Sequence, residues 1–168
     1  MFKIIACLNP KGTIGNDGKL IYRISNDLQN FQRQTLGNVV IMGRKTFESL
    51  PNGEPLKDRI NIIITSNKEY NVKENENVYI VDSIESVVEL CNAFFSDKEL
   101  FVIGGESIYR EFLDRNLVNE MRLTIVTNDF TEGDVHFPKY NEEEWRTVYE
   151  SLEQTSNELK FIFKVLKK

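Results

Sequence analysis

The sequence predicts an α/β fold, with a single domain built on a mixed, mostly parallel central sheet. Short apolar runs rich in Ile and Val alternate with amphipathic stretches along most of the 168 residues, which is typical of strands that alternate with helices. The runs lack polar alternation, as expected of parallel strands that are buried on both faces. The last third instead alternates polar and apolar residues with period two, which predicts an antiparallel hairpin at one edge.

Taken in chain order, these patterns predict about eight strands flanked by about four helices. The apolar runs predict strands at residues 2–8, 39–42, 60–65, 78–81, 99–103 and 120–126. The amphipathic stretches predict helices at 25–36, 84–95 and 107–115, and a further helix that starts within 43–46. The hairpin is expected to pair residues 142–154 with residues 157–168.

Composition narrows the classes of function. The formal net charge of −5 argues against a nucleic-acid partner or a membrane surface, because both need a basic field. Cys7 and Cys91 lack CxxC spacing and lie in apolar segments, so we expect neither a disulfide framework nor a metal site. His136 is the only histidine, which excludes histidine triads. With no signal peptide or membrane span indicated, we expect a cytoplasmic protein.

Asp27 interrupts an otherwise apolar helical stripe. Ile24, Leu28, Phe31 and Thr35 fall on one face at 3.6 residues per turn, and Asp27 lies beside them. A carboxylate there is partly desolvated, so either a partner compensates it or the protein uses its perturbed protonation. A plainer alternative is an acid in the first turn that interacts favourably with the helix dipole.

Two strand ends run into helix starts that are suited to anions. Residues 43–46, GRKT, offer a glycine turn, two cations and a hydroxyl, and residues 104–109, GGESIY, offer a glycine pair. A third strand end offers Thr65 and Ser66. Three such turns at one edge of an open sheet indicate a phosphate-bearing cofactor lying across the sheet. Neither glycine motif has P-loop or GxGxxG spacing.

The segment NPKGTIGNDGKLIY, residues 9–22, joins the first strand to the Asp27 helix. Its three glycines predict a mobile loop, and a loop beside a buried carboxylate is a natural lid. A plain surface turn is the alternative. The apolar side chains of Ile14, Leu20 and Ile21 favour the lid, because a surface turn does not need them.

Together these residues resemble dihydrofolate reductase. Ile14-Gly15, Leu20, Asp27, Phe31 and Thr35 fit the spacing of that family around its lid and acid. Further segments resemble the family in the right order, namely VIMGRKTFES at 40–49, RINIIIT at 59–65, FVIGGESIY at 101–109, LTIV at 123–126 and EGDVHFPKY at 132–140. The resemblance covers nearly the whole chain.

The resemblance implies reduction of 7,8-dihydrofolate to tetrahydrofolate by NADPH, in support of one-carbon and thymidylate metabolism. It also implies binding of antifolate-type small molecules, a monomer, and a dihydrofolate-reductase-like domain over residues 1–168 with an adenosine-binding subdomain at about 38–97. Two alternatives stay open: a noncatalytic module of the same fold, and a pyrimidine reductase of riboflavin synthesis.

By the same resemblance, Asp27 holds the amino and ring nitrogens of the pterin, Thr124 supports Asp27, and Arg59 grips the glutamate carboxylate. The expected walls of the substrate site are Ile5, Leu28, Phe31, Ser49, Leu50, Leu56 and Ile103. The expected cofactor positions are Cys7, Ile14, Gly15, Gly43, Lys45, Thr46, Gly104, Gly105, Ser107, Ile108 and Tyr109, with Arg44, Thr65 and Ser66 at the 2′-phosphate.

The chain departs from the family at Ile21 and Tyr22, where Pro-Trp is usual. Loss of the proline frees the lid backbone, and phenol has a shorter reach than indole. We expect Leu20 and Tyr22 to join Asp27 in the catalytic group. The hypothesis for Tyr22 is a water-mediated polar link beside the pterin.

Overall fold

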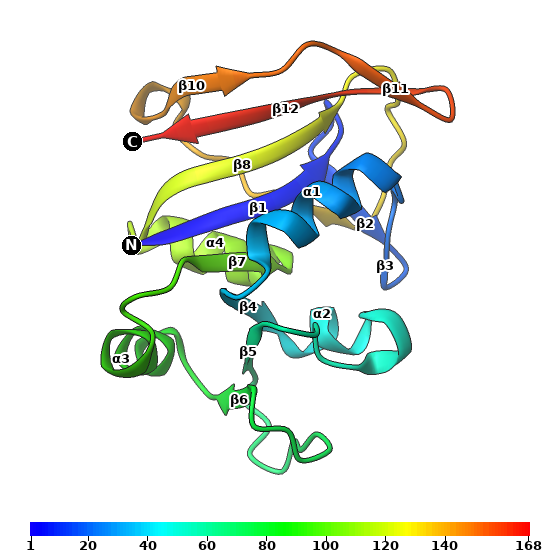
Figure 1. The fold of residues 1–168 in the computed structure, drawn as a ribbon. Coiled ribbons are helices and arrows are strands. Elements are labelled where there is room, and N and C mark those ends of the chain that lie inside the picture. The colour runs from blue at the N-terminus through cyan, green and yellow to red at the C-terminus, as the bar shows by residue number, and fades with distance from the viewer.

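A computed structural model describes residues 1–168 and confirms the predicted class (Figure 1). The strands of the main sheet are β1 (Phe2–Leu8), β4 (Val39–Gly43), β5 (Ile60–Ile64), β6 (Val78–Val81), β7 (Leu100–Gly104), β8 (Val118–Val126), β10 (Arg146–Glu150), β11 (Gln154–Ser156) and β12 (Leu159–Lys167). The helices are α1 (Ser25–Thr35), α2 (Arg44–Glu48), α3 (Ile84–Phe94) and α4 (Glu106–Asp114), with 3-10 turns at Pro51–Gly53 and Glu142–Glu144. None of the helices combines the length and the hydropathy needed to cross a bilayer.

The sheet is parallel in its centre and antiparallel at one edge. Its order is β10-β12-β8-β1-β7-β4-β5-β6, and β11 pairs with β12 outside this path. β1 runs parallel to both β7 and β8, and β4 runs parallel to both β5 and β7. β12 is antiparallel to β8, β10 and β11. The carboxyl ends of β1, β7, β4 and β5 therefore meet at one edge, where the predicted turns lie.

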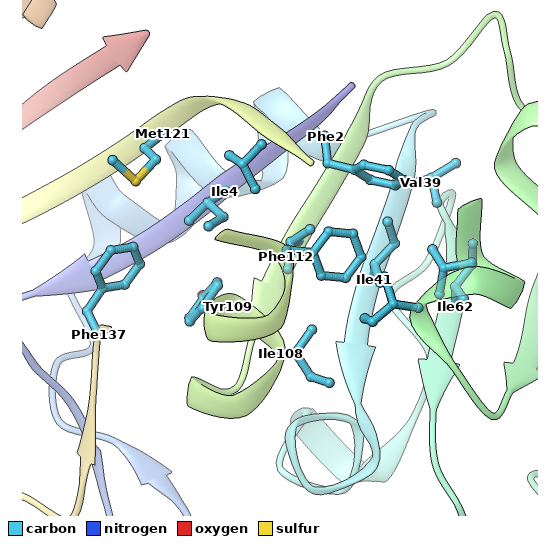
Figure 2. Packing of buried hydrophobic residues seen from close by; sticks show 14 of the residues in the cluster. Phe2, Ile4, Val39, Ile41, Ile62, Ile108, Tyr109, Phe112, Met121 and Phe137 are labelled. Carbon is cyan, nitrogen blue, oxygen red and sulfur yellow. The ribbon is translucent and has the colours of Figure 1, made fainter. Parts of the chain in front are cut away.

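Both faces of the central strands are covered, and β4 shows how. Val39 and Ile41 belong to the main core with residues of α3 and α4, whereas Val40 and Met42 pack with Phe47 of α2 on the opposite face. Figure 2 shows Val39 and Ile41 near Phe112 of α4. All four β4 side chains are fully buried, and each such burial stabilises the fold by about 1.5–3 kcal/mol. This explains why the run shows no polar alternation.

The C-terminal hairpin differs from the prediction in its first arm. The second arm is one strand, β12, but the first is divided into a 3-10 turn, β10 and β11, with Ser151–Glu153 between the two strands. The register shifts between Thr147 and Tyr149, and such a bulge bends a strand. Ser151 still follows the ladder, because its amide donates to Phe163 O and its hydroxyl accepts from Phe163 N, both at 2.9 Å.

The lid segment, residues 9–22, forms a small second sheet instead of an irregular loop. β2 (Thr13–Asn16) pairs with β3 (Lys19–Leu20) and with β9 (Val135–His136). The hairpin turn is Asp17-Gly18, both with positive φ of 51° and 73°, as a two-residue turn of type I′ requires. The lid is therefore tied to a segment more than a hundred residues later in the chain.

Candidate active site

Asp27 lies in the first turn of α1, with its carboxylate directed at β8. The hydroxyl of Thr124 donates to Asp27 Oδ1 at 2.5 Å. Burial raises the pKa of Asp27, and hydrogen bonds from Thr124 and the Cys7 thiol partly offset that rise. Leu28 on the same helix is 42% exposed and Phe31 is half-buried. The predicted stripe is thus left partly open beside a desolvated carboxylate instead of being filled by the protein.

β1, β8 and α4 each place a side chain close to the Asp27 carboxylate. Cys7 of β1 pairs in register with Thr124 of β8, so both hydrogen-bond donors to Asp27 lie side by side. The Tyr109 hydroxyl of α4 donates to Ile5 O of β1 at 2.9 Å. Burial is the main cause that raises the pKa of the Tyr109 phenol, and the nearby Cys7 and Asp27 add to it. Tyr109 is therefore a neutral, fixed group close to Asp27.

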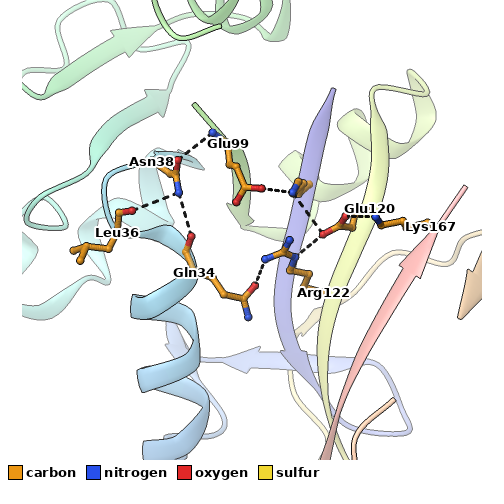
Figure 3. A network of polar contacts seen from close by, with 8 residues as sticks. Gln34, Leu36, Asn38, Glu99, Glu120, Arg122 and Lys167 are labelled. Atoms are coloured by element: carbon orange, nitrogen blue, oxygen red, sulfur yellow. Dashed lines mark hydrogen bonds and ion pairs between the residues drawn. The ribbon is translucent and has the colours of Figure 1, made fainter. Parts of the chain in front are cut away.

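The far end of α1 is held on β8 as well (Figure 3). Gln34 Oε1 accepts from Arg122 Nη1 at 2.6 Å, and Arg122 Nε donates to Glu120 at 2.5 Å. Burial opposes ionisation of Glu120, but Arg122, Lys3 and Lys167 together keep its pKa below the usual value. Hydrogen bonds to β8 therefore fix both ends of α1, which sets where Asp27 stands on the sheet.

Arg59 is a buried guanidinium, 9% exposed, at the start of β5. Its Nε donates to Lys57 O at 2.9 Å and its Nη1 donates to Thr35 Oγ1 at 3.2 Å. Both acceptors are neutral oxygens, and burial lowers the pKa of Arg59. A desolvated cation bonded only to neutral oxygens is suited to receive a carboxylate from a ligand.

Asn61 is a site residue that the sequence reasoning missed. It is 1% exposed, its Oδ1 accepts from Leu56 N at 2.9 Å, and its Nδ2 donates to the carbonyls of Leu56 (3.0 Å) and Arg59 (3.1 Å). It therefore fixes the loop that carries a predicted wall residue and the predicted carboxylate clamp. The available signal was a lone polar residue inside the apolar run INIIIT.

The two glycine turns pack against each other. A Cβ on Gly105 would lie 3.3 Å from Thr46 Oγ1, and a Cβ on Gly43 would lie 3.2 Å from Ile108 Cγ1. Gly104 has a φ of +130°, a conformation that side chains rarely adopt, and the Gly104-Gly105 peptide is cis. The start of α2 thus lies directly beside the start of α4. A phosphate-bearing cofactor can approach a glycine backbone of this kind closely, because no side chain stands in the way.

The predicted phosphate end is more open. Arg44 Nη1 pairs with Glu48 at 3.0 Å, and the guanidinium carbon lies 5.9 Å from the centre of the Tyr70 ring. Lys45, Ser66 and Ser107 are exposed, and Thr65 follows β5 with its hydroxyl accepting from an amide two residues later. For Arg44 to bind a phosphate, its guanidinium has to exchange its carboxylate partner, Glu48.

The remaining predicted wall residues gather on the α2 face of the sheet. Leu50, Leu56 and Ile103 pack against one small buried cluster that contains Phe47 of α2. Ser49 is exposed and its hydroxyl donates to Thr46 O at 2.7 Å. These residues lie on the same face of the sheet as Thr124, since Thr124 alternates with the main-core residue Leu123 along β8.

The predicted site residues of the lid differ in burial. Ile14 and Gly15 are buried on β2, whereas Leu20 is 60% exposed. The Asp17 amide donates to the Asp134 carboxylate at 3.1 Å. A Cβ on Gly133 would approach the Gly15 carbonyl to 2.3 Å, so the lid lies as close to residues 133–136 as a glycine allows.

Tyr22 turns its polar tip into the protein. Its hydroxyl accepts from Asn9 Nδ2 at 3.1 Å, and its ring packs with Ile24, Val126 and Phe161. Tyr22 is 7% exposed. The water-mediated link to a pterin therefore stays a prediction, and the contact that the structure does contain is the one to Asn9.

Comparisons with known proteins identify the family. A sequence model of the family described as "Dihydrofolate reductase" matches residues 1–168. The chain is 38% identical to the dihydrofolate reductase of Staphylococcus haemolyticus over 145 residues, which are 86% of this chain and 81% of that protein. It is 35% identical to the Bacillus subtilis (strain 168) enzyme over 148 residues, 88% and 82% of the two chains.

A solved structure matches the fold over almost its whole length. It is the dihydrofolate reductase from Enterococcus faecalis complexed with NADP(H) and RAB-propyl, with a TM-score of 0.84 and 27% identity. The match covers 99% of this chain and 95% of that chain. The family model and the relatives together show that the chain belongs to the dihydrofolate reductase family.

Proposed function

We propose that Asp27 is the catalytic carboxylate of this NADPH-dependent dihydrofolate reductase, which reduces 7,8-dihydrofolate to 5,6,7,8-tetrahydrofolate. The observation that carries the assignment is a desolvated carboxylate with a raised pKa, held by Thr124 and flanked by the partly open Leu28 and Phe31. A planar heterocycle with adjacent amino and ring nitrogens satisfies both oxygens of such a carboxylate by paired hydrogen bonds.

The protein's own contribution to the reduction is to assist protonation of the substrate. When bound, NADPH supplies a hydride, and saturating a C=N bond requires one proton as well. Because burial raises the pKa of Asp27, this carboxylate holds a proton more readily near neutral pH than an exposed aspartate does. Thr124 donates to Oδ1 and so restrains the carboxylate, while each of its oxygens can still accept a hydrogen bond from the pterin.

The glycine turns provide the cofactor fit. The close packing of Gly43 on Ile108 and of Gly105 on Thr46 lets the starts of α2 and α4 lie side by side, where the backbone of both turns can approach one dinucleotide. Arg44, Thr65 and Ser66 would take the 2′-phosphate, which favours NADPH over NADH. The other residues assigned to the cofactor are Cys7, Ile14, Gly15, Lys45, Thr46, Gly104, Ser107, Ile108 and Tyr109.

Arg59 would take the glutamate carboxylate of the substrate, since its present acceptors are neutral oxygens. Ile5, Leu28, Phe31, Ser49, Leu50, Leu56 and Ile103 would line the pterin and benzoyl rings. Antifolate-type molecules would compete there by presenting a protonated base to Asp27. Leu20 and Tyr22 complete the proposed group around the pterin.

We further propose a cytoplasmic monomer, with residues 38–97 as the adenosine-binding subdomain. The continuous sheet supports a single folding unit, and β4, β5, β6, α2 and α3 fall within residues 38–97. The match of the family sequence model to the full chain counts against a pyrimidine reductase.

One assay tests the function. Oxidation of NADPH is followed by its absorbance with and without dihydrofolate, for the wild type and for Asp27→Asn. We expect dihydrofolate-dependent oxidation by the wild type and strong loss in the variant. Absence of dihydrofolate-dependent oxidation by the wild type would favour the noncatalytic alternative, and repeating the assay with NADH tests the phosphate assignment.

A further inference from the structure

Asn9 is a buried polar residue to which the proposed reaction assigns no role. It follows β1 directly and is 1% exposed. Its Oδ1 accepts from the amides of Lys11 (3.0 Å) and Thr13 (3.1 Å), while its Nδ2 donates to the Tyr22 hydroxyl (3.1 Å) and to Thr131 O (2.8 Å). Two amide hydrogens and two acceptor sites are all that such a side chain offers, so its orientation is fully determined.

The partners of Asn9 come from three separate segments. Lys11 and Thr13 begin the lid, Tyr22 ends it, and Thr131 belongs to the stretch that leads into β9. The lid is also paired with β9, through Thr13 with His136 and Gly15 with Val135. One side chain thus joins the two ends of the lid to each other and to the segment on which the lid rests.

The Tyr22 end of this contact leads towards the proposed carboxylate. Cys7 packs against the small cluster that contains the Tyr22 ring, and Cys7 pairs in register with Thr124, the donor to Asp27. Burial raises the pKa of Tyr22 to about 12, and the nearby Asp129 carboxylate also raises it. The hydroxyl therefore stays neutral across the working pH range, as a constant hydrogen-bonding partner for Asn9.

We infer that Asn9 and Tyr22 are positioning residues for the lid, and that their hydrogen bond supplies the restraint that Ile21, unlike a proline, does not give. Ile21 has a free φ, and its backbone amide makes only a long hydrogen bond, to Ile14 O at 3.4 Å. Its side chain packs against the cluster that contains the Tyr22 ring, but such packing does not fix the backbone as a proline ring does. A buried hydrogen-bond network in which every donor and acceptor is paired favours a single conformation. Only the kinetic test of this inference depends on the proposed function.

The structural test uses Asn9→Ala, Tyr22→Phe and the double variant, measured by amide hydrogen exchange of the lid without ligands. Tyr22→Phe, which removes one buried hydrogen bond, should accelerate exchange at Lys11 and Thr13 by about tenfold. Asn9→Ala removes four, including those that these two amides donate, and should accelerate exchange by at least as much. The double variant should exchange no faster than Asn9→Ala, because both changes break the same contact. Tyr22→Phe keeps the ring, so it preserves the packing if Asn9→Ala folds poorly.

Asn61→Ala is the matched control, because Asn61 is also 1% exposed and also makes three side-chain hydrogen bonds to backbone groups. It should lose comparable stability to urea without faster exchange in the lid. Equal acceleration of lid exchange by Asn61→Ala, unchanged exchange in both Asn9→Ala and Tyr22→Phe, or strictly additive effects would each overturn the inference.

The kinetic test separates positioning from general destabilisation. Single-turnover reduction should slow several-fold in both Asn9→Ala and Tyr22→Phe, with KM for dihydrofolate changed much less, since the lid acts on the reacting geometry. Asn9 is outside the group proposed around the pterin, so slowing in Asn9→Ala reports positioning and not a lost contact with the pterin. A several-fold rise in KM for dihydrofolate with no change in the single-turnover rate would contradict the positioning role. A wild type without dihydrofolate-dependent turnover would overturn the proposed function, while the exchange measurement would still decide the role of Asn9.

Discussion

The two ends of the proposed site differ in how firmly their charged groups are held. At the substrate end, Asp27 and Arg59 are desolvated and bonded to neutral protein groups. At the phosphate end, Arg44 is 38% exposed at its side chain and paired with Glu48 on the next turn of a short helix. The substrate end is fixed before any ligand arrives, whereas the phosphate end has to rearrange.

The difference has an energetic meaning. Buried charges that lack a charged partner cost stability, and a ligand that supplies the partner recovers that cost as affinity. An exposed pair such as Arg44 with Glu48 contributes only about 0–1 kcal/mol, so exchanging it costs little and also gains little. Substitutions at the substrate end should therefore have larger effects than substitutions at the phosphate end.

The largest effect is expected for Asp27→Asn, which keeps the shape but removes the titrating group. Activity with dihydrofolate at pH 7 should fall by about 10²–10⁴-fold, the usual contribution of a positioned acid or base. Steady-state kinetics of both proteins, measured at about every pH unit from about pH 5 to pH 9, determine this loss of activity. Asp97→Asn, an exposed aspartate in the turn after α3, is the surface control and should leave the rate unchanged.

The same variant should be more stable than the wild type at neutral pH. Because the pKa of Asp27 is raised in the folded state, the native protein binds more protons than the unfolded chain between the ordinary pKa and the raised one. The free energy of unfolding therefore falls as pH rises through that window. Urea denaturation as a function of pH should show this fall for the wild type only, and parallel curves would contradict the assignment.

A smaller effect is expected for Arg59→Lys, which keeps the charge but loses the planar fork. KM for dihydrofolate should rise by about tenfold with little change in kcat, because binding to the glutamate is the same in the ground and transition states. A dihydropterin without the aminobenzoylglutamate tail is the matched substrate control. An equal loss with both substrates would show that Arg59 acts through structure instead of through the carboxylate.

Arg44→Gln tests the exposed end. KM for NADPH should rise by up to about tenfold, while KM for NADH should stay unchanged, because only NADPH carries the 2′-phosphate. The difference between the cofactors should shrink at high salt, since exposed charges are screened. An equal rise in KM for both cofactors would show that Arg44 does not bind the 2′-phosphate.

The smallest effect is expected for Glu48→Gln, which removes the competing carboxylate. NADPH should bind about twofold more tightly, because Arg44 no longer has to leave an exposed ion pair. Fluorescence titration of NADPH measures the change, with NADH as the control ligand. Weaker NADPH binding would mean that Glu48 orients Arg44 for the phosphate.

Much of the fold could be predicted because its signals are local. The strand Val39–Gly43 is a continuous apolar run, Ile60–Ile64 is one apart from Asn61, and α1 and α3 have clear helical periods. The small sheet of the lid could not be predicted, since β2 pairs with Val135–His136 far along the chain. Three glycines in the segment predict mobility, and only the tertiary pairing overrides that local preference.

Within the site, residues with a distinct local pattern were easier to predict than residues that act through contacts. Asp27 stands out in an apolar stripe, and Thr46 stands at a helix start. Asn9 precedes a proline and looks like an ordinary turn residue, although it is buried and makes four side-chain hydrogen bonds. Its role depends on Tyr22 and Thr131, which no spacing in the sequence places beside it.

The missing side chain at Gly133 has a consequence for how this protein tolerates mutation. Any other residue there would bring a Cβ to 2.3 Å from the Gly15 carbonyl and 2.8 Å from Thr13 Cγ2, contacts that require the lid backbone to move away. One codon change could thus abolish the paired lid while Asp27, Arg59 and Arg44 all remain in place. A genetic screen for loss of activity should therefore recover changes at Gly133 in protein that is still folded and abundant.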